Sequence, residues 1–235
     1  MSNGYFQFKQ FTVWHDRCAM KVGTDGVLLG AWASVEHAQR MLDVGCGSGL
    51  IGLMLAQRYP EAQVVGIEID HEAAAQAAEN VAASPWADRL QVVEGDFCTY
   101  QSAEPFDLIV SNPPYFVDAL RPPVGERSLA RHAGGLNYES LFRHSRELLA
   151  PQGRVCVVLP AEVEQVATDA AFRNGLHATE KVCIYTKAGK PLRRVLLAFS
   201  TAIDPCRTTD FYLMDADGSY SDAYRKLTED FYLKL

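Results

Sequence analysis

A glycine-rich stretch decides the fold: Leu42-Asp43-Val44-Gly45-Cys46-Gly47-Ser48-Gly49. It joins an apolar run typical of a buried strand, Met41–Val44, to a run with helical spacing of apolar residues, Leu50–Arg58. Glycines at such a junction let the backbone turn tightly and let a ligand approach it closely, and the first turn of the helix offers free N–H donors. The stretch therefore predicts a ligand site at the carboxyl end of a parallel strand.

The chain beyond this stretch alternates between strand-like and helix-like patterns. The strand-like runs are Met41–Val44, Gln63–Ile67, Leu90–Val93, Phe106–Val110 and Val155–Leu159, and the clearest helical runs are Leu50–Arg58, Glu72–Ala83 and Tyr138–Leu149. Strands separated by helices predict right-handed crossover connections, and hence a parallel sheet with helices on both faces.

Both ends of the chain depart from this alternation. Phe6–Val13 fits a short hairpin, and Thr24–Trp32 has the spacing of a helix. Ala178–Tyr185 and Arg194–Thr201 are strand-like runs joined by a short loop, which predicts an antiparallel hairpin. We therefore predict an α/β, Rossmann-like fold, with a mostly parallel seven-stranded sheet, a C-terminal antiparallel hairpin and helices on both faces.

The composition is that of one folded domain, residues 1–235, with 48% hydrophobic and 22% charged residues. No apolar run reaches ~18 residues and no signal-peptide pattern opens the chain, so we expect a cytoplasmic protein without a membrane partner. The six cysteines lie 23 or more residues apart, which excludes CxxC pairs, and we expect no metal site. The net charge of −7 argues against a protein that coats nucleic acid by charge alone.

Two acids and an aromatic residue follow the next two strands. Glu68 stands 23 positions after Gly45 at the end of the second parallel strand, where a carboxylate can accept hydrogen bonds from both hydroxyls of a ribose. Asp96 follows the third strand and would hold an adenine amino group. Its neighbour Phe97 would pack on the adenine ring. These positions predict an adenosine-containing cofactor.

The glycines alone leave an NAD-dependent oxidoreductase open, because Gly47, Gly49 and Gly52 also satisfy the GxGxxG pattern. The register favours S-adenosylmethionine, since Gly45 follows the strand directly and Asp43 stands two residues before it. The acids around the loop also suit a positively charged sulfonium better than a pyrophosphate. We take Cys46 as a spacer in the loop. The residues expected to contact the cofactor here are Asp43, Gly45, Cys46, Gly47 and Gly49.

The segment Ser111-Asn112-Pro113-Pro114-Tyr115 follows the fourth parallel strand and indicates the chemistry. Two prolines fix the backbone and remove N–H donors, which leaves carbonyl oxygens facing the site. The side-chain oxygen of Asn112, which would also touch the cofactor, and the carbonyl of Pro113 would then accept both hydrogens of one NH2 group. Such acceptors aim the nitrogen lone pair at a methyl donor, so alignment supplies the catalysis. Tyr115 would stack on a flipped base. The predicted catalytic residues are Asn112, Pro113, Pro114 and Tyr115.

In order and spacing, these motifs resemble those of the class I amino-methyltransferases that act on adenine or on glutamine amides. The upstream segment His15–Trp32 is similar to the N-terminal signature of the bacterial tRNA adenine-N6 methyltransferases that modify the adenine at position 37 of a valine tRNA. Similarity extends to Gln76–Trp86, Arg193–Ser200 and Tyr220–Leu233, and so spans nearly the whole chain.

The resemblance implies S-adenosylmethionine as the cofactor, tRNA as the partner and methylation of an adenine N6 amino group as the reaction. It also implies that Lys21, Thr24 and Asp25 lie in a loop and helix that close over the cofactor, with residues 1–36 covering the site. The spacing of the residues alone would assign that helix only to packing.

Two basic segments are candidates for contact with RNA phosphates. Phe116–Leu136 is predicted to be a long loop that acts as a lid after the catalytic motif, and Lys181–Arg194 carries five cations and no acid. We expect the target adenine to leave its stack to enter the pocket. The candidate phosphate contacts are Arg121, Arg127, Arg131, Lys187, Lys190 and Arg193.

Four other functions share part of the pattern. Methylation of a protein glutamine, as in release-factor methyltransferases, would use the same two acceptors, but those enzymes usually carry a larger helical domain before the cofactor loop. A DNA adenine methyltransferase would normally need an added target-recognition domain. An NAD-dependent oxidoreductase has no evident use for the segment Asn112–Tyr115. A non-catalytic RNA-binding module would not need every expected cofactor position to be filled by a competent residue.

Overall fold

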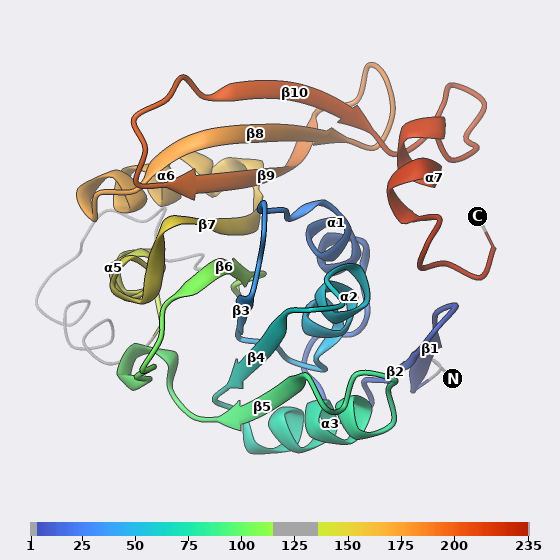
Figure 1. Cartoon of the computed structure of the whole chain (residues 1–235). Helices are drawn as coiled ribbons and strands as arrows, with labels where there is room; N and C mark the ends of the chain where they lie inside the picture. The colour runs from blue at the N-terminus through green and yellow to red at the C-terminus, as the bar shows by residue number, and fades with distance from the viewer. Residues whose placement is uncertain (1–3, 115–135, 235) are drawn as a thin grey trace, which may run out of the picture.

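The computed structural model describes residues 4–114 and 136–234, and its centre is an eight-stranded sheet in the order β10-β8-β9-β7-β6-β3-β4-β5 (Figure 1). The strands are β3 (Arg40–Val44), β4 (Gln63–Glu68), β5 (Leu90–Glu94), β6 (Phe106–Ser111), β7 (Leu149–Pro160), β8 (His177–Tyr185), β9 (Leu192–Ser200) and β10 (Arg207–Tyr212). Neighbours from β7 through β6, β3 and β4 to β5 run parallel, whereas β9 is antiparallel to both β7 and β8.

The predicted parallel sheet with an antiparallel hairpin near the C-terminus is confirmed, but the predicted number of seven strands is wrong. Strand β10 adds an eighth by pairing in parallel with β8, so the hairpin does not form the edge of the sheet. All residues of β10 except Phe211 are exposed. A strand of this kind lacks the buried alternation that makes an interior strand visible in a sequence.

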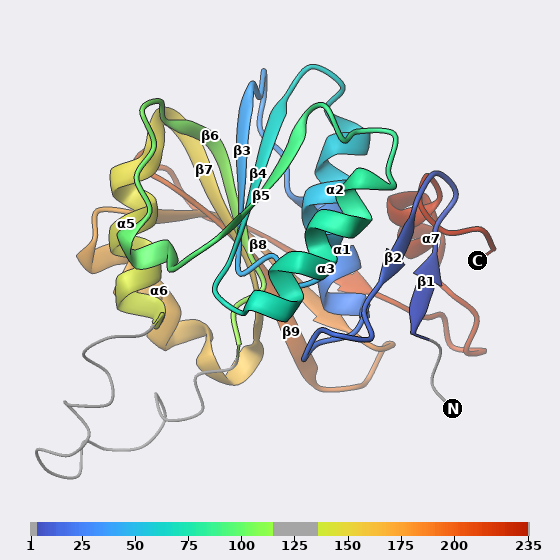
Figure 2. The same ribbon diagram turned by 90° about the horizontal axis from the view of Figure 1, so that it is seen from below.

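Helices cover both faces of the sheet, as predicted (Figure 2). They are α1 (Thr24–Trp32), α2 (Leu50–Arg58), α3 (His71–Ala82), α5 (Tyr138–Leu148), α6 (Glu164–Arg173) and α7 (Asp222–Thr228). Alternation along each strand divides the apolar side chains between the faces: Met41 joins the core under α1 and α2, and Leu42 joins the core under α5 and α6. Within the described ranges, no helix is both long and apolar enough to cross a membrane.

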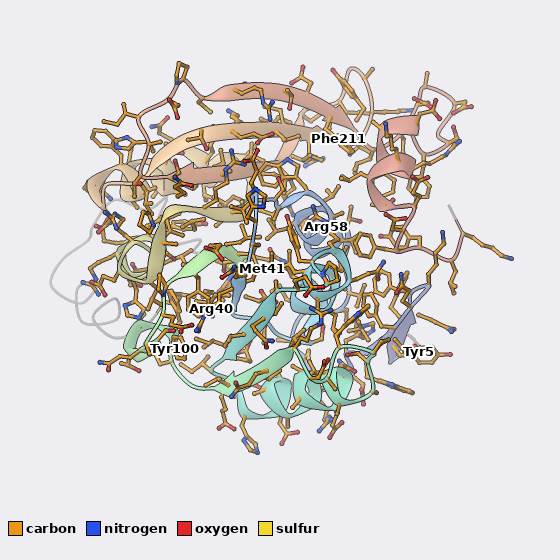
Figure 3. The ribbon with its side chains drawn as sticks, viewed as in Figure 1. Tyr5, Arg40, Met41, Arg58, Tyr100 and Phe211 are labelled. Atoms are coloured by element: carbon orange, nitrogen blue, oxygen red, sulfur yellow. The ribbon has the colours of Figure 1, made fainter. Side chains whose placement is uncertain are left out.

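Helix α1 packs closely against α2 because two glycines face the contact. A Cβ added at Gly30 would lie 2.7 Å from Sδ of Met54, and one at Gly26 would lie 3.1 Å from Cδ2 of Leu50. Arg58, near the centre of the molecule in Figure 3, closes the other end of the contact. Its guanidinium donates hydrogen bonds to the carbonyls of Gly30 (2.9 Å) and Ala33 (2.6 Å). A cation at these carbonyls stabilises the C-terminal end of α1.

The N-terminal hairpin is completed by residues from the far end of the chain. It consists of β1 (Tyr5–Gln7) and β2 (Thr12–Trp14), as predicted for this region. Phe8 forms an antiparallel bridge with Tyr232, and the N–H of Lys9 donates to the carbonyl of Phe231 at 2.8 Å. The hairpin therefore packs beside α7 instead of extending the central sheet.

Candidate active site

The glycine loop follows β3 in a conformation that depends on glycine. Gly45 and Gly47 have φ of 67° and 54°, in the left-handed region that residues with a Cβ rarely adopt. The N–H groups of Gly45 and Cys46 both donate to the carbonyl of Ile67, at 2.9 and 3.0 Å, which holds the loop against the end of β4. A Cβ at Gly45 or Gly47 would have no neighbour within 4 Å. The loop therefore forms one side of an open cradle.

Asp43 lies beneath this loop and is fully buried. Because side chains alternate along β3, its carboxyl points to the same face as Met41, towards α2, and Oδ2 accepts the N–H of Gly52 at 2.9 Å. Oδ1 has no hydrogen-bond partner among the described residues. Burial, and secondarily the nearby charge of Glu68, raises the pKa of Asp43 to about 7.

Glu68 ends β4 beside the loop and accepts hydrogen bonds with both carboxylate oxygens. Oε2 accepts from the N–H of Gly47 at 2.8 Å, and Oε1 accepts from the N–H of Asp70 at 3.0 Å. Asp70 in turn caps α3 by accepting the N–H of Ala73. Glu68 thus joins the glycine loop to the start of α3, and contact of its carboxylate with a ribose stays a prediction.

A cavity of about 390 Å³ opens above the loop. Its walls come from the loop, from the segment before α1 and the first turn of α1, and from Asn112. The predicted site residues that line it are Lys21, Thr24, Asp25, Gly45, Cys46, Gly47 and Asn112. Burial raises the pKa of the Cys46 thiol well above its usual value, so this thiol stays protonated at neutral pH. The segment before α1 with the first turn of α1, the glycine loop and Asn112 are far apart in the sequence but meet at this one cavity.

Asn112 reaches the cavity because β6 pairs with β3. Ser111, opposite Val44 in the parallel register, is fully buried and donates from Oγ to the carbonyl of Val44 at 2.9 Å. This bond fixes the end of β6 next to the start of the glycine loop, and Asn112 follows directly. Pro113 and Pro114 continue the chain from there. Tyr115 and the predicted lid residues Arg121, Arg127 and Arg131 lie outside the described residues.

Asp43 and Glu68 do not line this cavity, and neither do the other predicted cofactor residues Gly49, Asp96 and Phe97. Gly49 is the N-cap of α2. Asp96 caps the short helix η1 (Phe97–Thr99), where its Oδ1 accepts the N–H of Cys98 at 2.8 Å. Phe97 is 4% exposed, and its ring lies 4.9 Å from that of His144, so it belongs to the core in this structure. Contact of Asp96 and Phe97 with an adenine stays a prediction.

A second cavity, of about 280 Å³, adjoins the first, because Thr24 and Asp25 line both. Arg193 and Arg194 of β9 form its opposite side. Arg194 donates from Nε to Oδ2 of Asp25 at 2.7 Å. Arg193 is exposed, as is Lys190 in the turn before β9, while Lys187 is half-buried. One of the predicted RNA contacts, Arg193, therefore lines the cavity next to the cofactor cavity.

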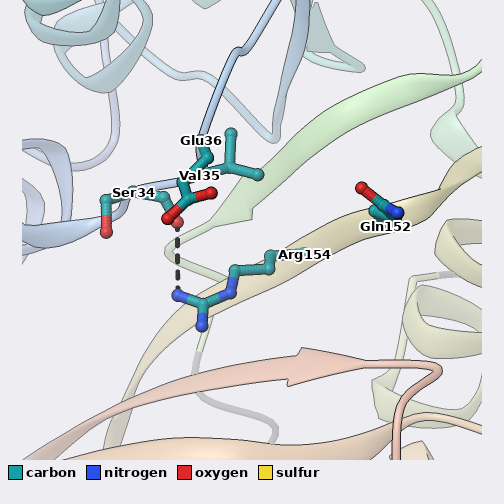
Figure 4. A pocket seen from close by; sticks show the side chains of 5 residues that line it. All are labelled: Ser34, Val35, Glu36, Gln152 and Arg154. Atoms are coloured by element: carbon teal, nitrogen blue, oxygen red, sulfur yellow. Dashed lines mark hydrogen bonds between the residues drawn. The ribbon is translucent and has the colours of Figure 1, made fainter.

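A third cavity, of about 400 Å³, lies away from these residues, at the amino-terminal ends of β3 and β7 (Figure 4). It is lined by Ser34, Val35, Glu36, Gln152 and Arg154. Arg154 is engaged there: its Nη1 donates to the carbonyl of Ser34 at 3.5 Å and lies 3.7 Å from Oε2 of Glu180. Ligands of open α/β sheets bind at the carboxyl ends of the strands, which favours the first cavity as the active site.

Sequence reasoning missed the residues that support the cavity from behind. Gln76 and Asn80 of α3 are each 1% exposed, and His15 is 5% exposed. The only local signal is that Gln76 and Asn80 stand four positions apart among small apolar residues of one helix. Amide side chains are usually exposed, and they are buried only where they are hydrogen-bonded. Their partners are distant in sequence, so the pattern alone could not identify them.

Known proteins are similar to this chain in both sequence and fold. A family model described as the methyltransferase small domain matches residues 20–185. A Bacteroides thetaiotaomicron protein named tRNA1(Val) (adenine(37)-N6)-methyltransferase is 51% identical over 236 positions, covering all of both chains. An Aeromonas hydrophila protein of the same name is 50% identical, covering 99% of each chain.

A crystal structure of a predicted O-methyltransferase from Agrobacterium tumefaciens has a TM-score of 0.67 at 20% identity, covering 88% of this chain and 96% of that one, and it shares the fold. The chain belongs to the methyltransferase small domain family, together with the bacterial tRNA1(Val) (adenine(37)-N6)-methyltransferases that it matches from end to end.

Proposed function

We propose that this protein transfers a methyl group from S-adenosylmethionine to the N6 amino group of the adenine at position 37 of tRNA1(Val). The observation that carries the proposal is that Asn112 lies in the wall of the same cavity as the glycine loop. The relatives that match the whole chain at about half identity carry this activity in their names. We expect the enzyme to act in the cytoplasm on tRNA, without a membrane partner.

The residues around the first cavity suit this cofactor. When bound, S-adenosylmethionine supplies an electrophilic methyl group on a positively charged sulfonium. The open cradle at Gly45 and Gly47 leaves room for a ligand against the backbone, and the buried carboxyl of Asp43, whose Oδ1 has no hydrogen-bond partner among the described residues, lies beneath the loop. Glu68 would accept the ribose hydroxyls, and Lys21 would pair with the carboxylate of the methionine part.

Asn112 and Pro113 would hold the amine to be methylated. An aromatic amine is a poor nucleophile because its lone pair is delocalised into the ring. The amide oxygen of Asn112 and the carbonyl oxygen of Pro113 would each accept one N–H hydrogen, which favours a more tetrahedral nitrogen and directs its lone pair into the cavity. No strong base is needed, since the nitrogen becomes acidic only after it has gained the methyl group. The catalytic contribution of these residues is alignment and fixed dipoles.

The second cavity would receive a part of the RNA next to the flipped base. Arg193 lines it and is exposed, with Lys190 and Lys187 in the adjoining turn. Cations at this place would pair with backbone phosphates and offset the net negative charge of the protein, which is −7. Tyr115, Arg121, Arg127 and Arg131 remain predicted contacts to the base and its phosphates.

The decisive experiment is transfer of labelled methyl from S-adenosylmethionine to bulk tRNA, followed by nucleoside analysis. The wild-type protein should produce N6-methyladenosine. Asn112→Ala should lose activity by about 100-fold or more, as expected when a group that aligns the reacting atoms is removed. Labelling of a protein fraction in place of tRNA would overturn the proposal. So would wild-type activity in Asn112→Ala.

A further inference from the structure

Two buried amides of α3 connect both walls of the first cavity although neither of them lines it. Gln76 and Asn80 are each 1% exposed, and residues four apart lie on the same face of a helix. A buried primary amide is costly unless its oxygen and its nitrogen are both hydrogen-bonded. The hydrogen-bond partners of these two side chains therefore identify the segments that this face of α3 positions.

Asn80 binds two segments with one side chain. Its Oδ1 accepts the N–H of Trp14 at 2.9 Å, and its Nδ2 donates to the carbonyl of Trp14 at 2.8 Å. The same Nδ2 donates to the carbonyl of Ser48 at 2.9 Å. Ser48 belongs to the glycine loop and lines the cavity. Asn80 thus joins the end of β2 directly to the loop.

Gln76 holds the next residues of the same segment. Its Oε1 accepts the N–H of Arg17 at 3.0 Å and the thiol of Cys18 at 3.2 Å, and its Nε2 donates to Oδ1 of Asp16 at 2.6 Å. One turn along the helix, Glu79 forms an exposed ion pair with Arg17. The segment 14–18 is therefore fixed along α3 by backbone and side-chain contacts.

The segment continues into the opposite wall of the cavity. Met20 and Lys21, which line the cavity, follow two and three residues after Cys18. The buried His15, which belongs to the segment 14–18, also binds the chain beyond Lys21, because its Nδ1 accepts the N–H of Val22 at 3.4 Å. One helix face thus contacts the loop wall through Ser48 and anchors the residues that lead into the other wall.

We propose that Gln76 and Asn80 are positioning residues that set the separation of the two cavity walls and thereby the affinity for S-adenosylmethionine. They act through Ser48 and the segment 14–18 and do not touch the cofactor. Without them the segment would be free in the absence of ligand, and binding would have to order it again, which lowers affinity. The inference rests on the proposed function only for the identity of the ligand.

The sharpest variant is Asn80→Asp. It keeps the shape of the side chain but places a second acceptor opposite the carbonyls of Trp14 and Ser48, where Nδ2 now donates. Calorimetric titration with S-adenosylhomocysteine should give a Kd raised by about tenfold or more, as expected for broken buried hydrogen bonds. The turnover rate at saturating S-adenosylmethionine should remain within about twofold, because Asn112 is not displaced.

Two further variants separate positioning from folding. Gln76→Met preserves length but removes the bonds to Asp16 and Arg17, and it should also raise the Kd while hydrogen exchange of amides 14–22 becomes faster. Glu79→Gln is the matched control on the same helix: it loses only the exposed ion pair and should leave the Kd within about twofold.

The outcomes distinguish this inference from the proposed function. A raised Kd with preserved turnover in a folded Asn80→Asp or Gln76→Met variant supports it. Wild-type affinity in a folded variant of either kind overturns it, as does loss of folding in both, which would make the pair purely structural. Failure of the wild-type protein itself to bind S-adenosylhomocysteine would overturn the proposed function and this inference with it.

Discussion

Arg194 donates from Nε to Oδ2 of Asp25 at 2.7 Å, although the two residues are 169 positions apart. Asp25 lies in the first turn of α1 and lines the cofactor cavity, while Arg194 follows the basic turn that is proposed to contact RNA. This ion pair therefore joins the wall of the first cavity to the wall of the second cavity.

A double-mutant cycle should detect this pair. The side chains of Arg194 and Asp25 are 29% and 24% exposed, so solvent weakens their attraction only in part. For Asp25→Asn and Arg194→Gln we expect a coupling of about 1 kcal/mol in the free energy of unfolding, measured in urea. The more exposed pair Arg173–Glu139, at 58% and 49%, should give a smaller value in the same assay. Equal coupling in both pairs would contradict this expectation.

Gly47→Ala should impair cofactor binding beyond its effect on stability. The residue has φ of 54°, so a Cβ strains the backbone by about 1 kcal/mol, and the new methyl group would enter open space at the cavity wall. Gly175→Ala is the matched control, because Gly175 has φ of 72° and equally open surroundings but lies between α6 and β8. Thermal unfolding should shift similarly for both variants, while titration with S-adenosylhomocysteine should show a raised Kd for Gly47→Ala alone.

Asp43 should make the ligand-free protein less stable as the pH rises. Burial raises its pKa to about 7 in the folded state, from an ordinary value of 3.8 in the unfolded chain. Between these values the folded protein holds a proton that the unfolded chain has lost, so the free energy of unfolding falls as the pH increases from 3.8 towards 7. The stability that Asp43 contributes through this proton is fully present below pH 3.8 and is lost as the pH rises through about 7.

Asp43→Asn tests this directly, because an amide oxygen can still accept the N–H of Gly52 but never ionises. The variant should lack this part of the pH dependence, and its free energy of unfolding at pH 8 should exceed that of the wild type by on the order of 4 kcal/mol, the scale set by the difference between the two pKa values. Urea unfolding at pH 5 and pH 8 without cofactor measures both quantities. Parallel pH profiles for the two proteins would refute the assignment to Asp43.

Replacing Lys190 and Arg193 by alanine should weaken tRNA binding without changing the affinity for S-adenosylmethionine. Each lost phosphate contact should reduce the slope of log affinity against log salt by about 0.9, and affinity at physiological salt should fall by about tenfold. The double variant Arg225→Ala and Lys226→Ala, on α7, is a control that also removes two exposed cations. If the salt slope of the Lys190 and Arg193 double variant equals that of the wild type, the basic turn does not contact RNA.

Much of the architecture could be predicted because local patterns specify it. The strand from Phe106 to Ser111 and the helix from Leu50 to Arg58 follow from apolar periodicity, and the glycine loop follows from its place between a strand and a helix. Asn112 could be assigned to the site because parallel strands bring their carboxyl ends to one edge of the sheet.

The remaining features depend on partners distant in sequence. Strand β10 is defined by its pairing with β8 and not by its exposed residues, so no local pattern indicates it. The contacts of Arg194 with Asp25 and of Asn80 with Trp14 and Ser48 join residues that lie far apart in the sequence, so no local pattern indicates them. Phe97 shows a further limit of local patterns: its place next to Asp96 predicts a ligand contact, whereas its packing in the core beside His144 depends on a residue 47 positions later.

The contacts between the N-terminal hairpin and the C-terminal residues have a consequence for biosynthesis. Lys9 donates from Nζ to the carbonyl of Glu229, 220 positions later, at 2.6 Å, and its neighbour Phe8 bridges to Tyr232. Contacts of such long sequence separation require the closure of a large loop, which costs conformational entropy. During translation the hairpin therefore leaves the ribosome early but remains without its final neighbours until residue 232 has also emerged.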